Sequence, residues 1–187
     1  MGGYKQVNFY RKRSAAALFF CLIILIALPS QHALAAIKSG LIYNLDYNFW
    51  INMPSQWERV KGPFGGDQAE QLIDPLRNAF VEVYASRMPQ KVTLQYIADN
   101  WEVKAQEKNI AYVQKRISSE EREIKGAQAI LRIYEGTAAT VIFKSYILFC
   151  YHKDMAYVVI GVFPKKFARK YEALVKKAAL SFRLIEP

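Results

Sequence analysis

Short runs of closely spaced hydrophobic residues, separated by turn-forming residues, predict β-strands along most of the chain after residue 40. The clearest case is 79–85, where Ala79, Val81, Val83 and Ala85 alternate with polar or aromatic residues. This period of two residues is typical of a strand with one buried face. The same reasoning predicts strands at 41–47, 49–53, 111–118, 127–135, 140–151 and 155–163.

Two other segments have the spacing of amphipathic helices. In the first, 94–108, apolar residues recur at helical intervals, and Thr93 can cap the N-terminus. Pro164 can open the second helix. The expected apolar stripe of that helix consists of Phe167, Tyr171, Leu174 and Ala178. The chain then closes with a short extended segment at 180–184.

The order of these elements predicts the fold class. Runs of adjacent strands with few helices between them indicate an antiparallel sheet rather than a doubly wound parallel one. Because 140–151 and 155–163 are apolar on both faces, helices are expected to cover both faces of part of the sheet. We therefore predict an α/β/α sandwich, with an antiparallel sheet of about six strands flanked by helices. Glycine and proline pairs predict a long loop at 61–78.

The first 36 residues have the pattern of a cleavable secretory signal peptide. Basic residues precede an apolar run at 15–28, and Ala33, Ala35 and Ala36 supply the small side chains of a cleavage site. Cleavage after Ala35 or Ala36 leaves a single domain at 37–187. The alternative is a membrane anchor formed by an uncleaved signal, although an apolar run of about 14 residues is short of the roughly 20 that span a bilayer.

Cleavage changes the charge and the cysteine content of the domain. The formal net charge falls from +10 to +6, because residues 1–36 hold four basic residues and no acidic ones. A basic surplus favours anionic surfaces such as lipid headgroups or acidic protein faces, and ordinary solubilising charge is the alternative interpretation. Cys21 is lost with the signal, so Cys150 has no intramolecular disulfide partner. We expect the domain outside the cytoplasm, in the periplasm or secreted.

No motif in the sequence predicts catalysis or a cofactor. His152, the one histidine after the signal, lies beside a predicted turn, and neither His-Glu-x-x-His nor Cys-x-x-Cys occurs. The glycine-rich run at 62–66 is not followed by the Lys-Ser or Lys-Thr of a phosphate-binding loop. Asp67, Glu70 and Asp74 lack the spacing of a calcium loop. The prediction is a protein that is not an enzyme and has no cofactor or metal.

The most suggestive local feature is the basic face of the last predicted helix. It could bind anionic lipid or an acidic partner, and the alternative is the solvated face of a helix packed on the core. A single acidic residue, Glu172, lies among the basic ones. The candidate partner-binding residues are Lys165, Lys166, Arg169, Lys170, Lys176 and Lys177. Nucleic acid is not expected as a partner, because an exported domain would rarely meet it.

Two short motifs resemble the PsbP-like domains, an exported family that includes the DcrB-type envelope proteins. Residues 49–57, Phe-Trp-Ile-Asn-Met-Pro-Ser-Gln-Trp, resemble the first strand and the Pro-Ser-x-Trp turn of the family. Residues 179–182, Ala-Leu-Ser-Phe, resemble its closing helix and short Ser-Phe segment. Through the order of elements, the resemblance extends over 41–184. It implies an antiparallel sheet between helices, and it implies export.

PsbP itself is an extrinsic subunit of photosystem II that helps it to retain calcium and chloride, in part through residues ahead of the domain. Here the first predicted strand begins shortly after the expected cleavage site, so that extension has no counterpart. The resemblance therefore carries no site residue to this chain, and fold analogy alone does not define a function.

The sequence as a whole predicts an exported non-enzymatic module. We expect it to dock on an envelope or membrane-associated protein complex, or on an anionic membrane surface, through the basic helix and the 61–78 loop. The alternative is a periplasmic carrier or enzyme with a small apolar ligand pocket between the sheet and this loop. Trp50, Trp57 and Tyr84 are the aromatic residues expected near such a pocket.

Overall fold

The computed structural model describes residues 40–60, 67–88, 91–125 and 127–185. The predicted signal peptide, with Ala33, Ala35 and Ala36, lies outside the described residues, and so does the glycine-rich run at 62–66. None of the helices within the described ranges is both long enough and apolar enough to cross a membrane.

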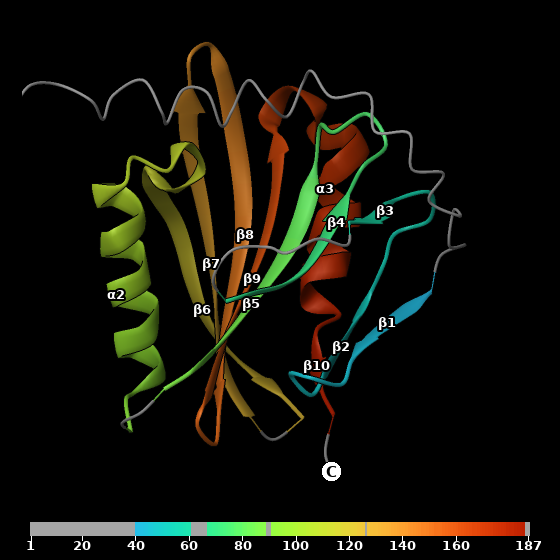
Figure 1. The fold of residues 1–187 in the computed structure, drawn as a ribbon. Helices are drawn as coiled ribbons and strands as arrows, with labels where there is room; N and C mark the ends of the chain where they lie inside the picture. The colour runs from blue at the N-terminus through green and yellow to red at the C-terminus, as the bar shows by residue number, and fades with distance from the viewer. Residues whose placement is uncertain (1–39, 61–66, 89–90, 126, 186–187) are drawn as a thin grey trace, which may run out of the picture. The chain divides into compact units, whose positions relative to one another are not determined.

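A seven-stranded antiparallel sheet organises the fold, in the order β3-β4-β5-β9-β8-β7-β6 (Figure 1). Strands β6 to β9 form a continuous meander, and β5 then pairs along its whole length with β9. The strands are β3 (Glu58–Val60), β4 (Gln68–Ile73), β5 (Phe80–Arg87), β6 (Lys115–Ile124), β7 (Ala127–Ala138), β8 (Val141–His152) and β9 (Met155–Pro164).

Smaller elements cover the two faces of this sheet. Strands β1 (Leu41–Asn44), β2 (Phe49–Asn52) and β10 (Arg183–Leu184) form a second antiparallel sheet. The helical elements are α2 (Leu94–Glu107), α3 (Ala168–Leu180) and the 3-10 turns η1 (Ala111–Val113) and η2 (Lys165–Phe167). Figure 1 shows α2 on one face of the large sheet and α3 on the other. Helices therefore cover both faces, as predicted.

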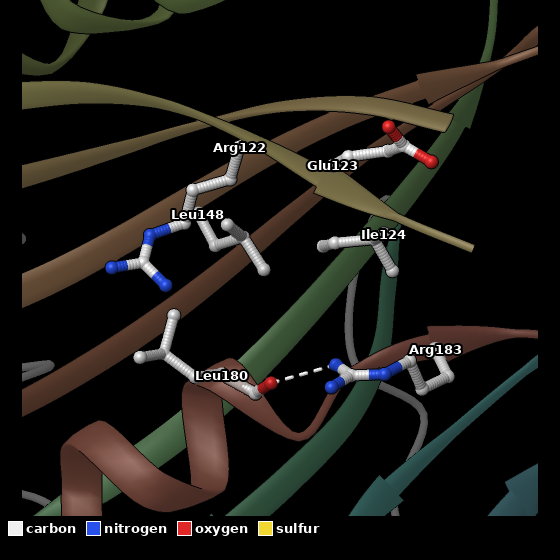
Figure 2. Close-up of a pocket in the computed structure, with 6 residues that line it drawn as sticks. All are labelled: Arg122, Glu123, Ile124, Leu148, Leu180 and Arg183. Atoms are coloured by element: carbon white, nitrogen blue, oxygen red, sulfur yellow. Dashed lines mark hydrogen bonds between the residues drawn. The ribbon is translucent and has the colours of Figure 1, made fainter. Parts of the chain in front are cut away.

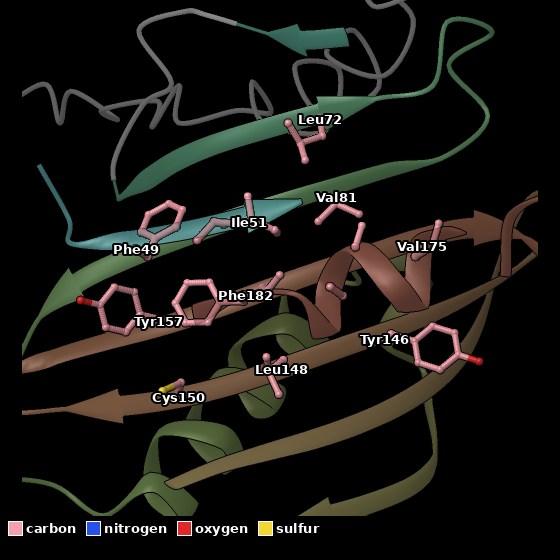
Figure 3. Close-up of a cluster of buried hydrophobic side chains, with 14 of the residues drawn as sticks. Phe49, Ile51, Leu72, Val81, Tyr146, Leu148, Cys150, Tyr157, Val175 and Phe182 are labelled. Atoms are coloured by element: carbon pink, nitrogen blue, oxygen red, sulfur yellow. The ribbon is translucent and has the colours of Figure 1, made fainter. Parts of the chain in front are cut away.

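Alternation along the strands creates two hydrophobic cores. On β5, Val81 and Val83 are fully buried in the core beneath α3, whereas Phe80 and Tyr84 pack against the core beneath α2. Figure 3 shows how Phe49 and Ile51 of β2 extend the α3-side core beyond the large sheet. The apolar character of β8 and β9 on both faces follows from their central position between these two cores.

A buried arginine fixes α2 to the sheet. Arg132 of β7 has no solvent exposure, and its guanidinium binds Asp99 and Glu102 of α2, the latter at 2.9 Å. The same guanidinium lies 5.7 Å from the centre of the Phe149 ring, and Tyr134 donates a 2.8 Å hydrogen bond to Glu102. At the start of α2, the Thr93 side chain accepts a hydrogen bond from the Tyr96 amide, which is the predicted cap.

Several predicted elements differ from the structure. The sheet has seven strands rather than about six, and one of them, β4, lies inside the segment 61–78 that was predicted to be a loop. The predicted strand at 111–118 is replaced by η1 and β6, and β6 continues through the acidic run to Ile124. The strand predicted at 127–135 extends to Ala138, and the β7–β8 turn follows at Ala139, which has a φ of 52°.

Candidate functional site

Helix α3 packs closely on the large sheet through residues with small or compact side chains. Its buried residues are Tyr171, Val175, Ala178 and Ala179. Opposite Val175 lies Gly161 of β9, and a β-carbon placed on this glycine would come within 2.5 Å of the Val175 Cγ1 atom. The close approach fixes which side of α3 faces the sheet, and therefore which residues face outward.

The outward side of α3 and η2 carries all six candidate partner-binding residues, each of them exposed: Lys165, Lys166, Arg169, Lys170, Lys176 and Lys177. Lys165 forms an ion pair of 2.8 Å with Glu135, and Lys170 lies 4.0 Å from Asp74. Within the described residues the other four have no carboxylate at ion-pair distance. The structure thus brings the predicted residues together on one surface.

The single acidic residue of α3 does not offset these charges. Glu172 turns toward the sheet, where it accepts hydrogen bonds from Lys144 and Tyr146. These two donors, Lys144 foremost, lower the pKa of the Glu172 carboxyl. Although the Glu172 side chain is 37% exposed, its carboxylate is bound by β8, and cations therefore predominate on the outer face of α3.

Two apolar residues of the predicted helix stripe are exposed, which corrects the prediction. Phe167 and Leu174 are 37% and 39% exposed, and Val175 and Ala179 occupy the sheet-facing positions instead. Phe167 belongs to the 3-10 turn η2 rather than to α3, so it does not share the helical spacing of Tyr171 and Ala178, which are buried as predicted. The basic face therefore contains apolar side chains as well as charge.

Contacts join the N-terminal end of α3 to the β4–β5 turn. Lys170 donates a 2.8 Å hydrogen bond to the hydroxyl of Tyr171, which donates one of 2.8 Å to the buried carboxylate of Asp74. Asp74 accepts a further bond of 3.1 Å from the amide of Leu76, which is 69% exposed at the turn. Sequence reasoning missed Leu76, because only the contact between Tyr171 and Asp74 places it beside α3.

Two hollows lie near the β6–β7 hairpin, away from this face. The first, of about 260 Å³, is lined by Arg122, Glu123, Ile124, Leu148, Leu180 and Arg183 (Figure 2). Arg122 pairs with Glu120 at 2.9 Å, and Arg183 donates to the Leu180 and Phe182 carbonyls at 2.7 and 2.6 Å. Both guanidinium groups therefore have partners within the protein, although Arg122 Nε is buried without a hydrogen bond to the described residues. Glu123 adds a negative charge to the lining.

The second hollow, of about 560 Å³, opens on the α2 side of the same hairpin. Its lining is mostly polar and carries charges of both signs. The lining residues are Thr93, Leu94, Gln95, Glu121, Arg122, Glu123, Gln128, Ala129 and Ile130. Mixed charge without a convergent set of donors or acceptors does not define a ligand class.

A half-buried carboxylate lies on the α2 side of β5. Glu82 accepts hydrogen bonds from Gln71 at 2.6 Å and from the Tyr84 hydroxyl at 3.1 Å. Burial raises the pKa of the Glu82 carboxyl despite these bonds. Perturbed carboxylates are frequent in active sites but also occur in structural networks. Among the described residues, no cluster of three or more His, Cys, Asp and Glu side chains could hold a metal ion.

The aromatic residues expected near a ligand pocket do not converge. Trp57 is buried in the α3-side core, whereas Tyr84 packs against the α2-side core, on the opposite face of the sheet. Trp50 is half-buried on β2 of the small sheet. The three side chains thus do not line a common pocket beside the segment 61–78.

The remaining candidate residues are separated as well. Asp67 accepts a hydrogen bond from Ser86, Glu70 is paired with Arg59, and Asp74 binds Tyr171. His152 ends β8 at the β8–β9 turn, as the sequence predicted. Cys150 is fully buried, and burial raises the pKa of its thiol to about 12.

Comparisons with known proteins identify the fold. Neither a family model nor a curated protein matches the chain. Among solved structures, cyanobacterial PsbP (CyanoP) from Synechocystis sp. PCC 6803 is similar with a TM-score of 0.62 and 13% identity, over 84% of this chain and 98% of CyanoP. LpqN of Mycobacterium tuberculosis, a protein involved in cell envelope biogenesis, is similar with a TM-score of 0.58 and 7% identity, over 80% of this chain and 91% of LpqN.

These similarities show a PsbP-like fold. They confirm the fold that the motifs at 49–57 and 179–182 predicted, apart from the number of strands. At identities of 13% and 7% the similarity concerns the fold alone, and function has to be argued from the surface of this chain.

Proposed function

We propose that this protein is an exported, non-enzymatic module that docks on an anionic surface of the cell envelope through the basic face of η2 and α3. That surface belongs to a membrane-associated protein complex or to the membrane itself. The observation that carries the proposal is the one-sided charge of α3, since its cations face outward and its only acid, Glu172, is bound by β8. A face with a surplus of cations attracts anionic surfaces and accelerates encounter with them.

The likeness to extracytoplasmic folds supports the location. CyanoP and LpqN share the fold, LpqN is described as involved in cell envelope biogenesis, and the N-terminal sequence pattern independently favours export. Elsewhere in the described domain, the acidic and aromatic candidate residues lie apart, and the two hollows are lined by charges of both signs. The basic face of η2 and α3 is therefore the surface that we favour as functional.

Photocrosslinking in intact cells tests the proposal. A photoreactive residue at Arg169 or Lys177, both exposed and without an acidic partner among the described residues, should capture a protein or lipid neighbour. The matched control is Ser119, exposed on the edge strand β6 and distant from α3 in the strand order. Capture at Ser119 equal to that at Arg169 and Lys177, or capture at none of these positions, contradicts docking through α3.

A further inference from the structure

One end of α3 combines exposed apolar side chains with cations, and we propose that it inserts into the headgroup region of an anionic phospholipid bilayer. This inference rests on the proposed function and names the partner of the same face as a lipid surface. We call this end the α3 tip and define it as Leu76, Lys166, Phe167, Arg169 and Lys170. Figure 1 shows the β4–β5 turn beside the first turn of α3.

Contacts link Lys166, Phe167 and Lys170 of the α3 tip to the turn that carries Leu76, although these residues come from distant parts of the chain. The Lys166 ammonium lies 4.9 Å from the centre of the Phe167 ring, and that ring lies 6.2 Å from the ring of Tyr171. Lys170 lies 4.5 Å from the Tyr171 ring. Through Tyr171 and Asp74 the contacts then reach the β4–β5 turn, which carries Leu76.

The turn holds Leu76 in place rather than leaving it mobile. Asp74 forms three hydrogen bonds inside the turn: its amide donates to the Ala79 carbonyl at 2.9 Å, its carbonyl accepts from the Arg77 amide at 2.7 Å, and its carboxylate accepts from the Leu76 amide at 3.1 Å. Such side-chain-to-backbone bonds are typical of a tight Asx turn. The Leu76 side chain, held by this turn at 69% exposure, does not contribute to the hydrophobic core.

The basic residues of the α3 tip favour an anionic partner. Among the residues that the structure describes, the one acid in contact with the tip is Asp74, which is only 5% exposed and is already engaged by Tyr171 and Lys170. A partner that approaches from solvent therefore meets Lys166, Arg169 and Lys170, with Phe167 and Leu76 between or beside them. Long basic side chains keep their charge in water while their stems cover apolar surface, which suits the boundary between headgroups and acyl chains.

The mixture of apolar and cationic side chains on the tip favours a bilayer over an acidic protein. Leu76 is 69% exposed in the β4–β5 turn and Phe167 is 37% exposed in η2, so apolar atoms reach solvent beside the cations. Exposed apolar side chains can enter the deformable headgroup layer to a depth of about 5–10 Å, where apolar burial adds to attraction by anionic lipids. A protein partner would need a matching pocket with acids around it, which is a more demanding requirement.

A labelled cysteine at position 76 tests insertion directly. The full-length gene carrying Cys21→Ser and Leu76→Cys is expressed, and the exported protein is labelled with an environment-sensitive dye. Cys150 is fully buried with a pKa of about 12, so it should escape labelling. Upon mixing with vesicles of phosphatidylglycerol and phosphatidylcholine, the emission should shift to the blue and brighten. Vesicles of phosphatidylcholine alone should leave it unchanged.

The matched control places the same dye at Leu45, which is 73% exposed in the β1–β2 turn. The adjoining Asn48 carbonyl accepts a hydrogen bond from Ile185 beyond the C-terminal end of α3, and the helix of 13 residues separates the two ends by about 20 Å. The dye at Leu45 should show no shift. An equal shift at both positions overturns the inference, because binding would then not be oriented through the tip.

Vesicle co-sedimentation of substituted proteins gives a second measurement. Leu76→Ser with Phe167→Ser, and separately Lys166→Glu with Arg169→Glu, should each lower partitioning by about tenfold or more. Leu174→Ser removes an apolar side chain of similar exposure about 10 Å further along α3 and should leave partitioning unchanged. If the unsubstituted protein does not bind anionic vesicles while crosslinking at Arg169 still captures a protein, the lipid inference fails and the proposed docking function stands.

Discussion

The contact between α3 and the sheet predicts that Gly161→Ala destabilises the domain and that Val175→Ala reverses the effect. An alanine Cβ at this position would lie 2.5 Å from Val175 Cγ1 and 3.6 Å from Ala179 Cβ. Overpacking of this kind costs about 1–3 kcal/mol, from which the better strand conformation of alanine subtracts about 0.5 kcal/mol. The expected net loss of about 0.5–2.5 kcal/mol corresponds to a fall of roughly 1–10 °C in Tm.

Val175→Ala removes the methyl group that the new side chain would meet. On its own it should cost about 2 kcal/mol, because it deletes two buried methyl groups and leaves a cavity beside Gly161. In this background Gly161→Ala adds a methyl group to that cavity and should be neutral or stabilising. The change in unfolding free energy caused by Gly161→Ala should therefore be unfavourable in the wild-type background and zero or favourable in the Val175→Ala background. Urea unfolding of the four proteins in the double-mutant cycle measures it.

Gly136→Ala provides the control for this cycle. A β-carbon there would lie 1.8 Å from the carbonyl oxygen of Ala111, a backbone atom, and 3.3 Å from Cγ of Gln114. Gln114→Ala should therefore not rescue Gly136→Ala, whereas Val175→Ala should rescue Gly161→Ala. Additivity within about 0.5 kcal/mol for the Gly161 and Val175 pair would refute the proposed packing of α3.

Two further predictions concern buried charge. Arg132→Ala should destabilise the domain by about 3 kcal/mol in urea unfolding, the lower end of the range for a broken buried pair. Glu102, only 15% exposed, would lose its buried partner and keep Arg116 at 3.2 Å. Adding Glu102→Gln should recover part of the loss, and a fully additive double variant would contradict this account. Burial raises the pKa of Glu82 above its ordinary value of 4.5, so the stability it contributes is present at low pH and is lost as pH rises above 4.5 toward neutrality. Glu82→Gln should therefore flatten the wild-type decline in urea midpoint over that pH range, and an unchanged decline would exclude Glu82 as its source.

Elements with strong local signals could be predicted from the sequence. The alternation of residue types over 79–85 predicted strand β5 and also which of its faces is more deeply buried, because small and branched apolar residues occupy every second position. Helix α2 begins at the expected position, since the Thr93 cap is a local interaction. In both cases the residues that determine the element lie within it or next to it.

Other elements depend on partners that are distant in the sequence. Strand β4 has the sequence QAEQLI and lies in a segment rich in glycine and proline, yet it forms because β3 and β5 pair with it on either side. Strand β6 is an edge strand paired with β7 alone, so nearly all its residues are exposed and its polar sequence resembles that of a loop. Propensity could not reveal either strand, because the pairing that stabilises them is not local.

The candidate site also combines local and non-local features. Its basic residues were predictable from one short segment, but their interpretation depended on which residues bind Glu172. On an exposed helix, Glu172 and Lys176 have the spacing of a stabilising pair, which would make the charge of α3 ordinary surface patterning. Instead Glu172 binds Lys144 and Tyr146 on β8, and no ion pair with Lys176 forms. The sheet thus binds the only acid of the helix and leaves a face with a surplus of cations, beside which Asp74 and Tyr171 position an exposed leucine. This combination, rather than the number of basic residues, supports the proposal of a docking face.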